Sequence, residues 1–167
     1  MPALRQILQP LPAASLVLAG VAVTLAGAWT MQALGFEPCE LCLKQRTPYY
    51  AALPLATAAI FLARDRRLAA TKALLAALAA LFFASAIFAG YHAGVEWRFW
   101  PGPADCTGDF VKPATMEDFR KQLQQTRVVR CDEPSLRILG LSLADLNVFV
   151  SAGLSLIASL GASATKR

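Results

Sequence analysis

Four long apolar segments constrain the fold of this chain more than any other feature of its sequence. They run over residues 12–34, 45–63, 69–91 and 143–164. Each approaches the roughly 20 residues that a helix needs to cross about 30 Å of hydrocarbon. Since 56% of the residues are hydrophobic and only 16% are charged, the sequence predicts an all-α membrane protein. We expect a four-transmembrane-helix bundle in one domain, residues 1–167.

The second segment is the least regular of the four. Its apolar part begins only at Tyr49, and extending it back toward Cys42 to reach spanning length places Pro48 and Pro54 inside it. Prolines are tolerated in membrane helices where neighbouring groups satisfy the freed carbonyl. We therefore expect a kink in this span.

Charges between the spans predict which loops face the cytoplasm, because short cytoplasmic loops collect Lys and Arg. The two tails and the loop between the second and third spans hold seven basic residues against one acidic residue, Asp65. The basic residues are Arg5, Arg64, Arg66, Arg67, Lys72, Lys166 and Arg167. The remaining loops, about residues 35–44 and 92–142, are nearly neutral. We expect both termini in the cytoplasm and these two loops outside, so the net charge of +5 indicates topology and not nucleic-acid binding.

A cleaved signal peptide is the competing interpretation of the first span. Arg5 would be its charged start and Ala26-Gly27-Ala28 its small-residue cleavage site. The apolar run is longer than the usual signal core and continues past that site, which favours a span. Both interpretations leave the loop at residues 35–44 outside.

The outer loop at residues 92–142 is too short to bury much of a core alone. Thr115 to Asp118 is typical of a helix start with a Thr cap, and Met116, Phe119 and Leu123 then share one face. This predicts a short periplasmic amphipathic helix, which either lies on the bilayer surface or packs onto the ends of the spans.

Two smaller patterns border this loop. Trp97, Phe99 and Trp100 follow the third span and are typical of anchors at the membrane interface. Ser142 and Asp145 predict a cap at the start of the fourth span, so we assign Asp145 no catalytic role.

All four cysteines, Cys39, Cys42, Cys106 and Cys131, fall in the two outer loops. In a bacterium that side is the oxidising periplasm, where disulfides persist, and one pair per loop is implied. A Cys106–Cys131 bridge would close a loop of about 25 residues and could be structural, worth roughly 3 kcal/mol. A bridge between Cys39 and Cys42 would constrain very little, and such close pairs are typical of disulfides that open and re-form.

Zinc is the alternative use of four cysteines, but zinc ribbons usually repeat the close spacing in both halves, which Cys106 and Cys131 do not. We therefore favour redox chemistry and expect no metal. Leu43 follows Cys42, so there is no Cys-x-x-Cys-His motif for covalent haem, and a single His cannot supply a bis-histidine haem. No glycine-rich dinucleotide motif follows a predicted strand. These absences favour a lipid-soluble electron acceptor such as a quinone.

Two further residues are candidates for binding that acceptor. Arg46 lies four residues after Cys42 and would share a helical face with it, where its charge lowers the pKa of a thiolate and stabilises electron-rich oxygen. Its alternative role is to reach the lipid headgroups. His92, at the outer end of the third span, could give a proton or hydrogen bond to the same ligand, or simply satisfy itself at the interface.

With these residues in view, the chain resembles the bacterial disulfide bond formation protein B family, DsbB. The resemblance covers nearly the whole chain and rests on Pro38-Cys39-Glu40-Leu41-Cys42 with Gln45-Arg46, on Tyr91 to Trp97, on Arg130 to Glu133, and on Leu139 to Ser142. Vitamin K epoxide reductases share the general design but usually carry their redox pair on a later span.

The resemblance implies an inner-membrane enzyme that re-oxidises a periplasmic thioredoxin-like donor, similar to DsbA, and passes the electrons to ubiquinone or menaquinone. It implies that the donor attacks a Cys106–Cys131 bridge and that Cys106 forms the mixed disulfide. Cys39 would then exchange with Cys131, and Cys42 would face the quinone, with Arg46 and His92 around it. Two other hypotheses stay open: an electron exporter that keeps outer thiols reduced, and a non-enzymatic membrane scaffold.

Overall fold

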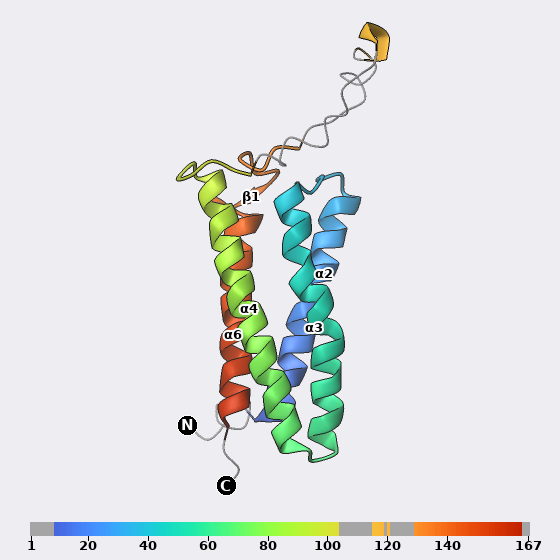
Figure 1. Cartoon of the computed structure of the whole chain (residues 1–167), viewed down its shortest axis with the longest axis vertical. Coiled ribbons are helices and arrows are strands. Elements are labelled where there is room, and N and C mark those ends of the chain that lie inside the picture. Colours follow the sequence, from blue (N-terminus) through green and yellow to red (C-terminus); the bar gives the residue numbers. More distant parts are fainter. Residues whose placement is uncertain (1–8, 104–114, 119, 121–128, 165–167) are drawn as a thin grey trace.

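The computed structural model describes residues 9–103, 115–118, 120 and 129–164. Four long helices lie side by side in it (Figure 1), and they are α2 (Pro10–Ala33), α3 (Glu40–Arg64), α4 (Leu68–Glu96) and α6 (Leu143–Ser163). The start of α2, the turn between α3 and α4 and the end of α6 meet at one end of the bundle. The loop between α2 and α3, the end of α4 and the start of α6 meet at the other. The expected all-helical architecture is confirmed.

Three of the described helices, α2, α4 and α6, are long and apolar enough to cross a membrane. Helix α3 is 25 residues long, but its first turns carry Glu40, Lys44 and Arg46, which lower its hydrophobicity. Pro48 and Pro54 lie inside it, and the helix continues through both. The expected kink at these residues stays a prediction.

Small residues line the inside of the bundle. The buried residues of α3 in the core are Tyr49, Ala52, Ala56 and Ala59, which repeat every three or four positions along one face. At the crossing of α2 and α6, a Cβ on Gly161 would overlap the Cβ of Ala13, so only glycine permits this approach. Large apolar side chains such as Phe61, Phe83 and Phe149 are exposed on the outside. Small residues inside and large apolar ones outside are typical of helices packed in lipid.

Two helices extend beyond the spans expected from the sequence, at the end of the bundle that carries the cysteines. Helix α3 begins at Glu40, and α4 continues to Glu96. His92 and Glu96 are therefore helical residues on the final turns of α4. In a helix, residues four positions apart share a face, so both side chains point the same way.

The predicted cap at the start of α6 is confirmed. The Ser142 hydroxyl accepts the Asp145 amide at 3.1 Å, and the Asp145 carboxylate accepts the Ser142 amide at 2.9 Å. The indole Nε1 of Trp97 also donates to Asp145, at 3.1 Å, so this ring ties α4 to α6. The Thr115 cap is present as well, since its hydroxyl accepts the Asp118 amide at 3.1 Å. Phe119 and Leu123, the rest of the predicted amphipathic face, lie outside the described residues.

A small β-hairpin precedes α6 and was not expected from the sequence. Strand β1 (Arg137–Ile138) pairs antiparallel with β2 (Leu141–Ser142). The two turn residues, Leu139 and Gly140, both have positive φ, at 53° and 86°. This is the backbone of the two-residue turns that join antiparallel strands. A leucine is unusual in that conformation, which explains why turn preferences did not predict the hairpin.

Candidate active site

The N-terminus of α3 is capped by a sulfur atom. Cys39 is the N-cap residue, and its Sγ accepts the backbone amide of Cys42 at 3.3 Å. Because Cys39 is the cap, Cys42, three residues later, lies on the first turn of α3. The two Sγ atoms lie 2.8 Å apart, and both thiols are free. The pair is therefore held at a distance from which a disulfide can form with little movement.

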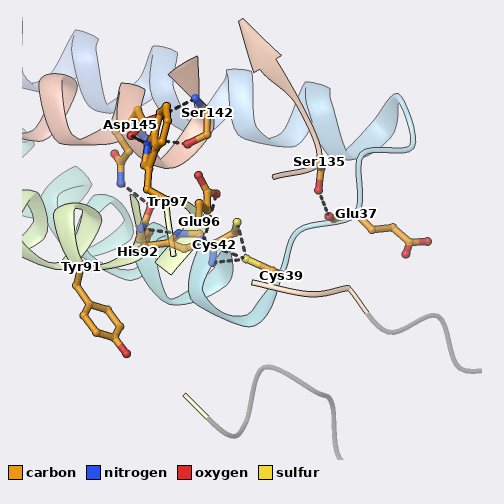
Figure 2. Close-up of polar contacts among 12 residues, drawn as sticks. Glu37, Cys39, Cys42, Tyr91, His92, Glu96, Trp97, Ser135, Ser142 and Asp145 are labelled. Atoms are coloured by element: carbon orange, nitrogen blue, oxygen red, sulfur yellow. Dashed lines mark hydrogen bonds and ion pairs between the residues drawn. The ribbon is translucent and has the colours of Figure 1, made fainter. Parts of the chain in front are cut away.

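His92 and Glu96 of α4 face this cysteine pair (Figure 2). The His92 Nε2 lies 3.6 Å from the Cys39 Sγ and 3.6 Å from the Glu96 Oε1. Both side chains are buried, with 1% of His92 and 8% of Glu96 exposed. Because α4 continues past the predicted span, these two groups project toward the start of α3.

A chain of hydrogen bonds fixes the other side of the His92 ring. The Tyr49 hydroxyl donates to the Asn147 Oδ1 at 2.6 Å, and the Asn147 Nδ2 donates to the Gln45 Oε1 at 2.8 Å. The Gln45 amide nitrogen therefore faces the His92 Nδ1, at 2.9 Å, as a donor. An amide nitrogen can only donate, so Nδ1 accepts and the ring proton resides on Nε2. The Nε2–H then points at Cys39 and Glu96.

These contacts favour the thiolate form of Cys39. The pKa of Cys39 is lowered to about 4, chiefly by the hydrogen bond from the Cys42 thiol, with further lowering by His92 and the Cys42 amide against the opposing effect of burial. The N-terminal end of a helix dipole acts in the same direction. We expected thiolate character at Cys42, next to Arg46, and the structure differs by favouring it at Cys39.

Arg46 is held by α2. Its guanidinium donates to the Gln32 Oε1 at 2.7 Å and to the carbonyl oxygen of Ala28 at 3.3 Å. Arg46 and Cys42 still share a helical face, as expected from their spacing, and both line the same cavity. The arginine charge is therefore placed beside the cavity and does not bond to either sulfur.

This cavity has a volume of about 290 Å³ and lies between α2, α3 and α6. Its walls are mostly apolar and include Leu25, Met31, Phe36, Leu146 and Val150, with a few polar groups from α3 and α4. It is close to the lower end of the range for small-molecule sites, roughly 300–1,000 Å³. A flat apolar ring that carries polar oxygens would suit this lining.

Glu96 contributes the most unusual atom of the cavity wall. Its Oε2 is buried and has no hydrogen-bond partner among the described residues. Buried polar atoms are nearly always paired, so an unpaired one at a cavity wall indicates a group that a ligand or an ordered water can satisfy. The cavity thus offers a ligand a polar partner at Glu96.

Cys131 belongs to the same region. It is disulfide-bonded and only 2% exposed, and it packs in an apolar cluster with Cys39, Leu41 and Val95. Cys106, its expected partner, lies outside the described residues, so that pairing stays a prediction. The structure brings Cys131 together with Cys39, while Cys42 and not Cys39 lines the cavity.

The donor atoms of Cys39, Cys42 and His92 lie within 4.8 Å of one another, which raises the question of zinc. Two sulfurs on one tetrahedral zinc, each bonded at about 2.3 Å, are held about 3.8 Å apart. The observed separation of 2.8 Å is much shorter. The sulfurs are therefore arranged for bonding to each other and not to a shared metal ion.

Four residues of the site, Glu96, Gln45, Asn147 and Tyr49, were not predicted from the sequence. The sequence did offer a way to find them, because polar residues within or beside apolar membrane segments often mark function. What the sequence does not reveal is that three helices join Tyr49, Asn147 and Gln45 to His92 in one hydrogen-bonded chain and place Glu96 beside it.

Comparison with known proteins adds independent findings. A family model described as "Disulfide bond formation protein DsbB" matches residues 11–161. An uncharacterised protein of Rickettsia prowazekii (strain Madrid E), RP370, is 24% identical over 118 residues, which cover 70% of this chain. The matched part spans 66% of that protein's length. No solved structure matches this chain significantly.

Proposed function

The chain belongs to the disulfide bond formation protein DsbB family of inner-membrane proteins, and from this premise we propose that it is a thiol oxidase that transfers electrons from a periplasmic protein dithiol to a membrane quinone. The main support for this proposal is that two neighbouring sulfurs lie against different parts of the site. Cys39 lies in one cluster with the disulfide-bonded Cys131, and Cys42 lines the apolar cavity. Electrons can enter at one sulfur and leave at the other.

The residues of the cavity fit the head group of a quinone. A bound quinone supplies an acceptor for two electrons and two protons. Arg46, fixed by two hydrogen bonds to α2, provides a positive charge that stabilises electron-rich oxygen. The Glu96 Oε2 offers a polar atom for an oxygen of the ligand.

A series of disulfide exchanges would lead to that acceptor. A reduced thioredoxin-fold donor attacks a Cys106–Cys131 disulfide at Cys106, and the Cys131 thiolate is released. Cys131 then attacks Cys39 in the oxidised Cys39–Cys42 pair, which frees Cys42. The second thiolate of the donor displaces Cys106, so the donor leaves oxidised, and Cys106 attacks Cys131 to re-form their disulfide and free Cys39. Each step breaks one S–S bond and forms another, so the electron pair moves one disulfide closer to the cavity. The helix N-terminus and His92 stabilise the negative charge on Cys39 when the pair is reduced.

The proposed orientation follows from charge. Arg64, Arg66 and Arg67 lie at the turn between α3 and α4. This turn is at the end of the bundle where α2 begins and α6 ends, and we place that end in the cytoplasm. The cysteine pair then lies on the periplasmic side, where a soluble donor can reach it.

The test is quinone reduction by the purified protein. With a reduced thioredoxin-fold donor and a short-chain ubiquinone or menaquinone, the wild type should reduce quinone, and Cys42→Ser should abolish the activity. Arg46→Ala should mainly raise the KM for quinone. Ser163→Ala, at the opposite end of α6, serves as the control. Turnover that persists in Cys42→Ser, or a wild type inactive with several donors and both quinones, would contradict the proposal.

A further inference from the structure

We propose that Glu96 is a catalytic proton carrier that stores one proton while the Cys39–Cys42 pair is reduced and donates it to the acceptor in the cavity. This inference rests on the proposed function and adds to it a residue and a proton path. Oxidation of a dithiol to a disulfide releases two electrons and two protons, and a quinone takes up both.

The reduced pair itself holds only one of these protons. The Cys39 Sγ receives the Cys42 amide at 3.3 Å and contacts the Cys42 thiol at 2.8 Å, with the His92 Nε2 at 3.6 Å. The Cys42 amide and the His92 Nε2–H both point at the Cys39 sulfur, which suits a thiolate there, while the Cys42 thiol keeps its hydrogen. The second proton of each two-electron reduction must therefore reside on another group.

Glu96 is suited to hold it. Its Oε1 lies 3.6 Å from the His92 Nε2, the Ser142 side chain interacts with its carboxyl group, and its Oε2 has no hydrogen-bond partner among the described residues. A buried carboxylate needs several donors to offset lost hydration, whereas a carboxylic acid needs fewer. The surroundings of Glu96 thus accommodate the acid, whose hydrogen can then be given to a ligand oxygen.

The other lining groups are poorer carriers. The hydrogens of the Arg46 guanidinium are already donated to the Gln32 side chain and the Ala28 carbonyl oxygen. The Tyr49 hydroxyl is already bonded to Asn147 and Ser151, at 2.6 Å and 3.0 Å. Glu37 is exposed to solvent, so it is not a buried acid beside the cysteine pair. Among the described lining residues, Glu96 is the buried acid that lies beside both the cysteine pair and the cavity.

His92 connects the two sites. When the pair becomes reduced, the hydrogen on Nε2 moves to Glu96 as the Cys39 hydrogen takes its place. When the pair is oxidised again, Cys42 and Glu96 would each give one proton to a bound acceptor, two electrons would leave the sulfurs with them, and the Cys39–Cys42 bond would form. Glu96 is then a carboxylate, ready for the next proton. Two protons and two electrons pass per cycle.

Infrared spectroscopy of the quinone-free, full-length protein tests the storage step. The difference spectrum between the reduced and oxidised pair should show a carboxylic-acid C=O band that grows on reduction and shifts in D₂O. Glu96→Gln, which keeps the shape but cannot carry a proton, should lack this band. Glu40→Gln, an exposed carboxylate on the first turn of α3, should retain it. A band that persists in Glu96→Gln would overturn the proposal.

Rapid mixing tests the donation step. After reduction of the pair, Glu96→Gln should reduce short-chain ubiquinone roughly 100-fold or more slowly than wild type, the usual effect of losing a general acid. A small weak acid such as formic acid should restore activity to Glu96→Ala in proportion to its concentration, which a merely structural role would not allow. A wild-type rate in Glu96→Gln, or no rescue of Glu96→Ala, would overturn the proton path alone. A wild type that reduces no quinone would overturn the proposed function and the path together.

Discussion

Cys39 shows how one side chain serves local structure and chemistry at once. As the N-cap of α3 it takes the place usually held by Ser, Thr, Asp or Asn, and its sulfur accepts the Cys42 amide. A thiolate accepts such bonds better than a thiol, so the cap and the reactive form stabilise each other. The helix start is therefore coupled to the redox state of the pair.

The first prediction concerns the reactivity of Cys39. Because its pKa is lowered to about 4, alkylation of the reduced protein by iodoacetamide should be nearly independent of pH between about pH 5 and about pH 8. An ordinary thiol would react about tenfold faster per pH unit in that range. Cys42→Ala removes the largest cause of the lowered pKa and should restore a steep dependence. A steep profile in the wild type would contradict the assignment.

The lowered pKa of Cys39 also makes the stability of the reduced protein depend on pH. A cysteine whose pKa is lower in the folded state stabilises that state fully above its unfolded pKa, near 9. This contribution declines as the pH falls from about 9 toward about 4, where the folded thiolate also takes up a proton. The reduced protein should thus lose stability over this window relative to Cys39→Ser.

The second prediction concerns Gln45, which joins Asn147 to His92. Gln45→Ala leaves the His92 Nδ1 and the Asn147 amide without this partner, at a cost of about 1–3 kcal/mol per buried unsatisfied group. It also frees the His92 ring to place its proton on Nδ1. We expect a lower melting temperature and a steeper pH dependence of Cys39 alkylation.

Lys44→Ala is the matched control for Gln45→Ala. Lys44 is the preceding residue on α3, and its pair with Glu40 is exposed, so its loss should change stability by less than about 1 kcal/mol. An unchanged alkylation profile in Gln45→Ala would show that the network does not set the tautomer of His92.

At the level of elements, helix ends decide the geometry of the site. Helix α4 ends at Glu96 because the chain then turns, with Arg98 at positive φ. A Cβ on Gly94 would overlap the Trp100 ring, so glycine lets this ring fold back and donate to the Tyr91 carbonyl at 2.9 Å. The last two turns of α4, which carry His92 and Glu96, are thus fixed in place.

The third prediction concerns the start of α6. Ser142→Ala removes the hydroxyl that accepts the Asp145 amide and should destabilise the protein by about 1 kcal/mol. Asp145 also accepts a hydrogen bond from the Trp97 indole, so a disturbed cap should alter Trp97 fluorescence. Thermal unfolding in detergent measures the first effect and emission spectra the second. Ser163→Ala, an exposed serine at the other end of α6, should change neither.

At the level of the whole molecule, the bundle places the two cysteines that lie beside Cys39, Cys42 and Cys131, at one end. The loop between α2 and α3, the end of α4 and the start of α6 meet there, far from the turn between α3 and α4 (Figure 1). Electrons can therefore reach the cavity without crossing the membrane. This geometry agrees with a donor and an acceptor that approach from the same side, one from water and one from lipid.

The fourth prediction tests the orientation in the membrane. In a variant whose own cysteines are replaced, a cysteine introduced at Gly35 should react with a membrane-impermeant maleimide in intact spheroplasts. A cysteine introduced at Asp65, in the turn between α3 and α4, should react only after lysis. Labelling of both positions from outside, or of Asp65 alone, would refute the proposed topology.

The sequence by itself determined the class of the molecule. Long apolar blocks can only be helices in a membrane, because the backbone must satisfy its own hydrogen bonds there, and this predicted four helices to within a few residues. The cap at Ser142 and Asp145 followed from local chemistry. The spacing of Cys39 and Cys42 is also a local pattern, since both residues lie on one turn, and it indicated a redox pair.

Only the tertiary structure decided how that pair is surrounded. Glu96 and His92 are more than fifty residues from Cys39 in sequence, and Asn147 is farther still, so no local pattern predicts that they meet. Their meeting depends on where α4 ends and on how closely α6 packs against it. Contacts at the ends of α3 and α4 then favour the charge on Cys39, through the Cys42 thiol and His92, and the packing of these helices brings the Glu96 carboxyl group to the cavity wall.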